Sequence, residues 1–253
     1  EPLPPGSGIR FGSLTTNETV GARAEFVDNT NHATNLRDGE IVARTIEHLM
    51  SALSGLHIDN INIYVNGPEV PIMDGSSKPF VELIEQNGIE VQNKKRKILK
   101  VKREIYVSNA KGSIKLVPNS QFSIDFEIEF PSPLVSKQSC QLQLMNGNYK
   151  TDVASARTFG FEKDVEDLRS NGFALGGSLE NAVVVGNNKI LNKEGLRFKD
   201  EFVRHKILDS IGDLYLAGAP IEAYFFGKKS GHNLNNQLLR KLFSDNSNFE
   251  YIN

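Results

Sequence analysis

The pattern of hydrophobic and polar positions is most informative near the end of the chain, in the segment Arg204–Asp213. On a helix, which turns about 100° per residue, His205, Asp209 and Asp213 fall in one polar row at i, i+4 and i+8. Apolar residues gather on roughly the opposite side of the same helix: Val203, Ile207, Ile211 and Leu214. The spacing therefore predicts a helix over about 200–216 that packs one side against a core and carries a histidine and two aspartates on the other.

Similar spacing predicts the other elements. Apolar positions three and four apart predict helices at four further places: 45–53, 79–86, about 162–170 and about 233–243. Period-two alternation predicts strands, and the clearest is Phe122–Phe130, where every second residue is apolar until Pro131 stops the run. Weaker strand patterns cover six other segments: 9–11, 24–27, 61–65, 98–107, 182–185 and 221–226.

A polar, charged run without apolar residues, 92–97, predicts a linker near the middle of the chain. On each side of it, strands are followed by paired helices, which is an α+β order. We therefore expect two α+β domains, a first over 1–94 and a second over 98–253. The two halves share this layout but show no sequence repeat.

Composition narrows the class of protein. Of 253 residues, 39% are apolar and 24% are charged, and the formal net charge of −2 gives no basic excess that would favour nucleic acid. The single cysteine, Cys140, excludes an intramolecular disulfide framework and a zinc site of several cysteines. No apolar run reaches the roughly 18 residues of a membrane-spanning helix, and the start lacks the regions of a signal peptide. We therefore expect a soluble, cytoplasmic protein in which any metal is held by His, Asp and Glu.

The polar row described above offers part of a metal site. A histidine and an aspartate one turn apart, such as His205 and Asp209, can bind one divalent metal through imidazole nitrogen and carboxylate oxygen. A catalytic zinc needs a third protein ligand and a nearby carboxylate that accepts a proton from water. His48 and Glu47, adjacent in another predicted helix, could supply these functions. The alternative makes His205 and Asp209 an i, i+4 charge pair and Glu47-His48 a surface pair, and spacing alone leaves both open.

Two further motifs could contribute chemistry. His232 precedes a predicted helix, so it could act as a general acid with its tautomer held by Asp213, or it could be an ordinary loop histidine. Thr158 could present a hydroxyl to a site, or it could simply end a core strand. His32 and His57 have no partner pattern, and we interpret both as non-catalytic.

Several long motifs in a fixed order give the chain a resemblance to a known family. They are 45–49 (Thr-Ile-Glu-His-Leu), 67–76 (Gly-Pro-Glu-Val-Pro-Ile-Met-Asp-Gly-Ser), 156–161, 176–182, 196–213 and 230–236. Together they resemble the UDP-3-O-acyl-N-acetylglucosamine deacetylase family, the zinc enzymes of lipid A biosynthesis in Gram-negative cells, over most of the chain. The resemblance implies two stacked domains, each a small, mostly antiparallel sheet with a helix pair. The helices would pack between the sheets, with the active site between the domains.

The resemblance also implies a reaction and a ligand set. The reaction is hydrolysis of the 2-acetamido group of the substrate to give UDP-3-O-acyl-glucosamine and acetate. One Zn²⁺ per chain would be bound by His48, His205 and Asp209. Glu47 would be the general base. Four residues would complete the catalytic set: His232 as proton donor to the leaving amine, Asp213 as its orienting partner, Thr158 as oxyanion donor and Lys206 as a substrate contact.

Substrate contacts follow from the same resemblance. It implies that Arg204 and Lys229 meet the UDP and pyrophosphate region. A β-α-β insert at about 162–190 would build an apolar passage for the 3-O-acyl chain, lined by Phe159, Phe161, Val165, Leu179 and Val184. The protein would act as a monomer on this small molecule, with no nucleic acid and no transmembrane segment.

Members of this family begin with further strands and a glycine-rich motif that contains a histidine. The resemblance therefore implies that this chain starts inside the first domain and leaves a sheet edge exposed. Two alternatives stay open. One is a zinc amidohydrolase of the same fold that acts on another N-acyl sugar. The other is a catalytically impaired form that binds a nucleotide sugar, although such a form has no need of the complete metal and acid–base set.

Overall fold

A computed structural model describes residues 1–14, 18–145 and 147–253 of the chain. It has the expected α+β class, with helices and several small sheets, and each sheet takes its strands from one side of the segment 88–97. Within the described residues, seven of the eleven strand pairings are antiparallel, so the sheets are mixed but mostly antiparallel.

The N-terminal part of the chain builds two small sheets and two helices. One sheet has the order β2-β1-β6 and consists of β1 (Ile9–Ser13), β2 (Thr19–Gly21) and β6 (Ile61–Val65). The other is antiparallel and consists of β3 (Val27–Asn29), β4 (Asn35–Asp38) and β5 (Ile41–Ala43). The two helices, α1 (Glu47–Gly55) and α2 (Lys78–Asn87), pack against each other.

A five-stranded sheet dominates the rest of the chain. Its order is β11-β10-β15-β9-β8, from β8 (Ile105–Ser108), β9 (Ser113–Val117), β10 (Ser123–Glu129), β11 (Lys137–Gln143) and β15 (Tyr224–Lys228). Two helices, α5 (Glu201–Leu214) and α6 (His232–Phe243), pack on its inner face. In β10 the alternate side chains Ile124, Phe126 and Ile128 are buried, which confirms the period-two prediction.

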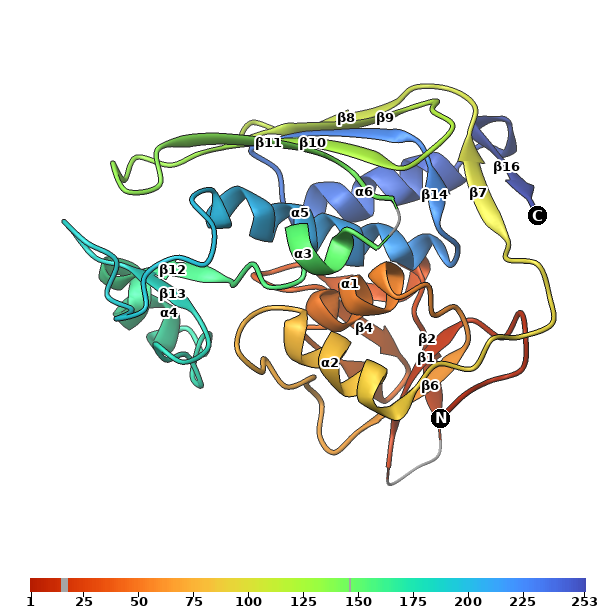
Figure 1. Ribbon diagram of the computed structural model, residues 1–253, viewed down its shortest axis with the longest axis horizontal. Helices are drawn as coiled ribbons and strands as arrows, with labels where there is room; N and C mark the ends of the chain where they lie inside the picture. Colours follow the sequence, from red (N-terminus) through yellow and green to blue (C-terminus); the bar gives the residue numbers. More distant parts are fainter. Residues whose placement is uncertain (15–17, 146) are drawn as a thin grey trace.

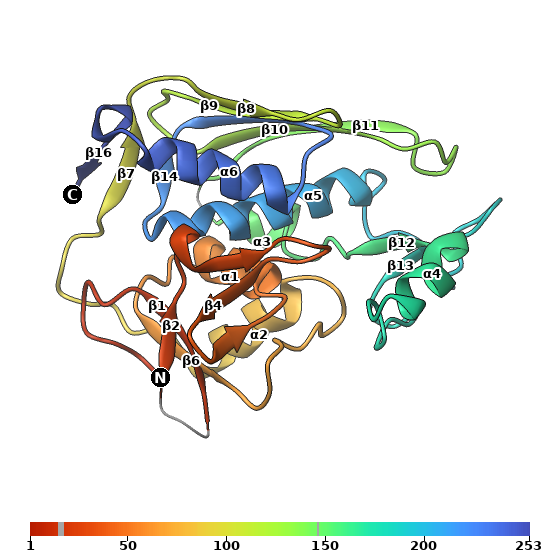
Figure 2. The same ribbon diagram turned by 180° about the vertical axis from the view of Figure 1, so that it is seen from behind.

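Smaller elements complete the fold. A three-stranded sheet has the order β14-β7-β16, from β7 (Ile98–Val101), β14 (Ile221–Glu222) and β16 (Phe249–Ile252). Helix α3 (Tyr149–Asp152) lies near the centre of the molecule (Figure 1). The parallel pair β12 (Phe159–Phe161) and β13 (Val183–Val185), with helix α4 (Val165–Ser170) between them in sequence, projects from one end (Figures 1 and 2).

The elements form layers, with helices in the middle. In Figure 1 the five-stranded sheet lies at the top, α5 and α6 lie beneath it, α1 follows, and α2 and the N-terminal strands lie together at the bottom. Helices α1 and α5 pack directly against each other. Residues of α5 are therefore buried on both sides of the helix, against the sheet and against α1.

Gly212 explains how closely these two helices approach. A Cβ at this position would lie 2.1 Å from the carbonyl oxygen of Glu47 and 3.0 Å from the backbone nitrogen of Ser51. Any side chain would therefore push α1 away from α5. On its other side α1 is tied to the start of α2, because the Ser77 hydroxyl donates to the carbonyl of His48 at 2.7 Å.

Two segments that were each predicted as a single strand contain two strands in the structure. The segment 98–107 is two strands, β7 and β8, because the chain leaves one sheet and enters another at the residues 102–104. The segment 221–226 divides at Ala223 into β14 and β15, which also belong to different sheets. Both breaks are set by which strands pair across the molecule, and local alternation does not record that pairing.

Element ends also differ from the predictions. The segment 24–27 is largely a 3₁₀-helix, Ala24–Phe26, rather than a strand. Helix α1 begins two residues later than predicted, because Thr45 has a left-handed backbone with φ 55°. The predicted 200–216 helix is α5 followed by a 3₁₀ turn, Tyr215–Ala217. Two more short 3₁₀ segments are Glu162–Asp164 and Asn246–Asn248.

Among the described residues, no helix combines the length and the apolar content that crossing a membrane requires.

Candidate metal centre and active site

The crossing of α1 and α5 brings His48, His205 and Asp209 together. One potential ligand atom from each side chain lies within 4.8 Å of the other two, and all three residues are buried. Asp209 Oδ1 is 3.3 Å from His205 Nε2 and 3.6 Å from His48 Nε2. Within the described ranges this is the one group of three or more His, Cys, Asp or Glu residues with such geometry.

The geometry of this group fits a zinc ion. Ligand atoms at about 2.0–2.1 Å from a tetrahedral zinc stand roughly 3.3 Å apart, close to the distances between Asp209 and the two imidazoles. Asp209 Oδ1 is buried and has no hydrogen-bond partner in the part of the chain that the structure describes. A metal ion bound between Asp209 and the two imidazoles would give this buried oxygen a partner.

The imidazole of His205 is prepared to act as a metal ligand. Its Nδ1 lies 3.1 Å from the carbonyl oxygen of Ala156 and donates to it, which leaves Nε2 free on the side of Asp209. Burial lowers the pKa of His205 to about 3, so the ring is neutral. His48 differs, because its Nδ1 has no hydrogen-bond partner among the described residues.

Glu47 lies beside the metal group at the start of α1. Its Oε2 accepts a hydrogen bond from the backbone N–H of Thr34 at 3.0 Å, and its Oε1 is 3.9 Å from His232 Nε2. Burial raises the pKa of Glu47, although His232 and His48 oppose the shift. A buried carboxylate with a raised pKa is well suited to accept a proton as a general base.

His232 and Asp213 form a hydrogen-bonded pair on the other side of Glu47. His232 Nδ1 donates to Asp213 Oδ2 at 2.8 Å, and a carboxylate only accepts, so Nδ1 carries a proton. His232 Nε2 is left facing Glu47 and Asp209, at 3.9 Å from each. Burial alone lowers the pKa of His232, but the carboxylates of Asp213, Glu47 and Asp209 outweigh it and raise the pKa to about 9. The imidazole can therefore hold a second proton near neutral pH.

Two residues outside the expected catalytic set complete this pair. The Thr34 hydroxyl donates to Asp213 Oδ1 at 2.5 Å, and Asn235 Nδ2 donates to Asp213 Oδ2 at 2.8 Å. Asn235 follows His232 by three residues on α6 and so shares its helix face, a spacing that could have identified it. Thr34 immediately precedes β4 and belongs to no periodic pattern.

Lys206 contacts the metal group, and Thr158 lines a cavity together with Lys206. The backbone N–H of Thr158 donates to the carbonyl of Gly75 at 2.7 Å. Gly75 has φ +82°, and a Cβ there would lie 2.1 Å from the carbonyl oxygen of Asn181, so the approach requires glycine. Lys206 Nζ donates to Asp209 Oδ2 at 2.7 Å, on the opposite carboxylate oxygen from the two imidazoles.

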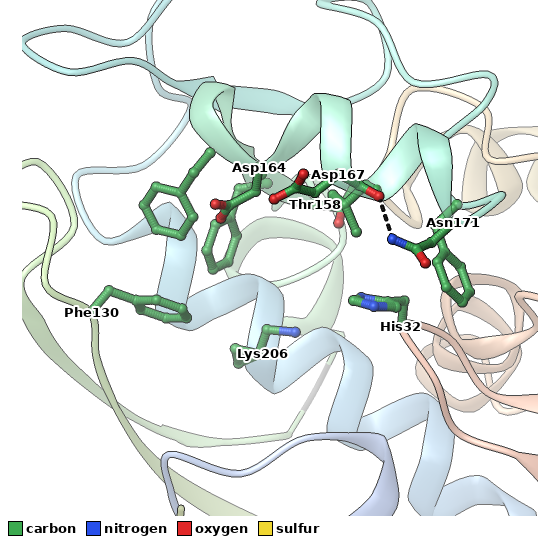
Figure 3. Close-up of a pocket in the computed structure, with 12 residues that line it drawn as sticks. His32, Phe130, Thr158, Asp164, Asp167, Asn171 and Lys206 are labelled. Carbon is green, nitrogen blue, oxygen red and sulfur yellow. Dashed lines mark hydrogen bonds between the residues drawn. The ribbon is translucent and has the colours of Figure 1, made fainter.

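A cavity of about 560 Å³ opens beside Thr158 and Lys206. In Figure 3, Lys206 rises from α5 into this space, and Asp164 and Asp167 lie opposite it on the side of α4. The apolar lining consists of five side chains: Phe130, Phe159, Phe161, Leu168 and Phe173. Of the residues expected to form an acyl passage, Phe159 and Phe161 line the cavity. The other three, Val165, Leu179 and Val184, are not among its lining residues.

His32 also lines this cavity, although no sequence pattern connected it with the site. Its ring packs on Phe173 with centroids 4.6 Å apart, and its backbone is left-handed with φ 60°. His57 lies elsewhere, with its Nδ1 2.8 Å from a guanidinium nitrogen of Arg96.

The two basic residues expected near the nucleotide are engaged by neighbouring groups. Arg204 donates to Asp200 Oδ1 at 2.6 Å and to the carbonyl of Asp152 at 2.7 Å. Lys229, at the end of β15, forms an ion pair with Glu129. Contact of either residue with a nucleotide stays a prediction.

A buried ion pair holds the segment that carries Thr158. Arg157 is 2% exposed, and its Nε donates at 2.9 Å to Glu201, which is fully buried at the start of α5. Glu201 also accepts the backbone N–H of Arg157 at 3.0 Å. The neighbours of Arg157 in the chain are Ala156, whose carbonyl accepts from His205, and Thr158. This pair therefore fixes two site contacts relative to α5.

Comparison with known proteins shows the family of this chain. Residues 1–244 match the family described as UDP-3-O-acyl N-acetylglycosamine deacetylase. Proteins named UDP-3-O-acyl-N-acetylglucosamine deacetylase are similar along the chain. The one from Psychrobacter cryohalolentis is 46% identical over 99% of this chain and 80% of its own length. The one from Coxiella burnetii is 44% identical over 99% of this chain and 84% of its own length. The one from Syntrophus aciditrophicus is 48% identical over 89% of this chain and 71% of its own length. The chain therefore belongs to the UDP-3-O-acyl N-acetylglycosamine deacetylase family.

Proposed function

We propose that this protein is a zinc-dependent deacetylase of lipid A biosynthesis in the cytoplasm. It hydrolyses the 2-acetamido group of UDP-3-O-acyl-N-acetylglucosamine to give UDP-3-O-acyl-glucosamine and acetate. The observation that carries the proposal is the arrangement of His48, His205 and Asp209 within 4.8 Å of one another, beside Glu47 and His232. The names of its relatives supply the substrate.

Zinc is the metal we propose for the group, one ion per chain. Two imidazoles and one carboxylate are a ligand set typical of catalytic zinc, which keeps one position open. When bound, such an ion lowers the pKa of a water molecule to about 7 and polarises a carbonyl oxygen. The remaining tasks of amide hydrolysis fall to side chains of this chain.

Glu47 and His232 divide the proton transfers between them. Hydrolysis adds a water oxygen to the acetamide carbon, breaks the C–N bond and delivers a proton to nitrogen. Glu47 accepts the proton that the water loses, which its raised pKa favours. His232, protonated and held by Asp213 at 2.8 Å, donates from Nε2 to the leaving nitrogen, so that the amine departs as a neutral group.

Thr158 and Lys206 act on the acetamide from the cavity side. Both line the same cavity. The Thr158 hydroxyl donates to the carbonyl oxygen, which becomes negatively charged as water adds. Lys206 is held in place by Asp209 at 2.7 Å and contributes positive charge on the same side.

The cavity lined by Phe159 and Phe161 receives the 3-O-acyl chain in this proposal. Four phenylalanines and a leucine form its apolar lining, and each buried methylene contributes about 0.8 kcal/mol of transfer free energy. The segment 162–190 closes it on one side, and Arg204 and Lys229 contact the UDP part.

We also propose that 1–94 and 98–253 are two domains of a monomer, because every sheet lies on one side of the segment between them.

Acetate release from UDP-3-O-acyl-N-acetylglucosamine, with and without a zinc chelator, tests this proposal. We expect turnover that is lost on chelation and restored by zinc, and no turnover by a His48→Ala, His205→Ala double variant. Full activity of that double variant would contradict the mechanism. Faster turnover of a different N-acyl sugar would instead show that the same site serves another substrate.

A further inference from the structure

Thr34 contacts two buried carboxylates of the site at once, those of Glu47 and Asp213. It is 2% exposed and lies in the segment between β3 and β4. Its backbone N–H donates to Glu47 Oε2 at 3.0 Å, and its hydroxyl donates to Asp213 Oδ1 at 2.5 Å. One residue therefore connects the general base on α1 with the carboxylate on α5 that orients His232.

The position of Thr34 is itself fixed by the start of α1. Its carbonyl accepts the backbone N–H of Ile46 at 3.2 Å. The next residue, Asn35, accepts the backbone N–H of Thr45 through its side-chain oxygen at 3.1 Å. These contacts surround the hydrogen bond to Glu47, so Thr34 cannot move without disturbing the first turn of α1.

The hydroxyl of Thr34 controls the orientation of the Asp213 carboxylate. Oδ2 accepts from His232 Nδ1 and from Asn235 Nδ2, both at 2.8 Å. Thr34 is the donor that the structure gives to the other oxygen, Oδ1. With donors on both oxygens the carboxylate plane is fixed. Without Thr34, a buried anionic oxygen loses its donor, and the plane can rotate away from His232.

We propose that Thr34 is a positioning residue for the deacetylation reaction. Its side chain is buried and its hydroxyl is bonded to Asp213, so it acts through neighbouring groups. It orients the Glu47 carboxylate through its backbone and the Asp213–His232 pair through its hydroxyl. This inference rests on the proposed function, because it assigns the two contacts to a reaction in which Glu47 and His232 move protons.

A double-mutant cycle separates this role from a general structural one. Thr34→Val keeps the size and the backbone N–H but removes the hydroxyl. We expect kcat to fall by about 10- to 100-fold with KM nearly unchanged, because a positioning residue acts on the chemical step. In a His232→Ala background the same substitution should lower kcat by less than about twofold, because the imidazole that Thr34 helps to position is already absent. An equal loss in both backgrounds would overturn the proposal.

Matched variants distinguish loss of the Thr34 hydroxyl from misfolding of the protein. Thr34→Ser keeps the hydroxyl and should recover most of the lost kcat, whereas Thr34→Ala should lose it as Thr34→Val does. Thr151→Val removes an exposed hydroxyl, bound to Asn148 and Asp152 outside the site, and serves as the control. A Thr34→Ala enzyme as active as wild type would also overturn the proposal.

Histidine NMR provides a measurement that needs no turnover. The chain has five histidines, so the Nδ1 proton of His232 can be assigned by its loss in His232→Ala. In zinc-loaded protein, this signal should shift in Thr34→Val and stay in place in Thr34→Ser. An unmoved signal in Thr34→Val contradicts the inference. If wild type fails to release acetate but the signal shifts, the proposed substrate is wrong and the positioning role of Thr34 stands.

Discussion

Replacing Gly212 with alanine should separate the metal ligands while leaving the protein folded. The new Cβ would lie 2.1 Å from the carbonyl oxygen of Glu47, whereas non-bonded heavy atoms pack at about 3.5 Å. Helix α1 must therefore retreat by about 1.4 Å, the difference between these distances. His48 follows Glu47 directly and moves with it. Metal sites tolerate only about 0.2 Å in ligand distance, so the retreat exceeds that tolerance several-fold.

The effect on stability should be smaller than the effect on the site. Overpacking costs about 1–3 kcal/mol, and alanine in a helix interior returns about 0.5–1 kcal/mol relative to glycine. A displacement of about 1 Å lowers turnover by roughly 100-fold. We therefore expect Gly212→Ala to fold with a slightly lower free energy of unfolding, bind zinc more weakly and lose about two orders of magnitude in kcat/KM.

Three measurements check this prediction: urea unfolding, zinc binding by competition with a chromophoric chelator, and acetate release. Gly176→Ala is the matched control, because a Cβ there meets no atom within 4 Å. A Gly212→Ala protein with the zinc affinity and kcat/KM of wild type would refute the reasoning, since the approach of α1 to α5 would then not set the ligand geometry.

Two other predictions concern buried groups. Arg157→Gln removes the charged partner of the buried Glu201 carboxylate and should lower the free energy of unfolding by about 3–5 kcal/mol; a loss below about 1 kcal/mol in urea unfolding would be inconsistent with the buried pair. Cys140 is 7% exposed, and burial raises its pKa to about 11, so iodoacetamide at pH 8 should label it slowly in native protein and rapidly in urea. Equal labelling rates in the two states would contradict the described environment.

Periodic patterns predicted the elements that bury one face. Strand β10 alternates because Ile124, Phe126 and Ile128 face the helices beneath the sheet. Helix α5 was predicted from its apolar row in the same way. The breaks at 102–104 and Ala223 could not be predicted, because they depend on which strands from distant parts of the chain pair with each segment.

The polar row on α5 shows what residue spacing alone cannot predict. An exposed charge pair and a buried metal site have the same i, i+4 pattern, and the difference lies in α1 covering His205 and Asp209. The family resemblance implied that α1 contacts α5 at these residues, whereas periodicity did not. Spacing did not indicate Thr34, because a single hydroxyl between two short strands has no periodic pattern and acts only through contacts made by folding.

The zinc content of the purified protein tests the central claim most directly. Elemental analysis should give about one zinc per chain in wild type and far less in His205→Ala. His57→Gln, which changes a histidine outside the site, should retain the wild-type content. Wild type without zinc after growth in zinc-supplemented medium, or His205→Ala with an undiminished content, would contradict the assignment of His48, His205 and Asp209 as the metal centre.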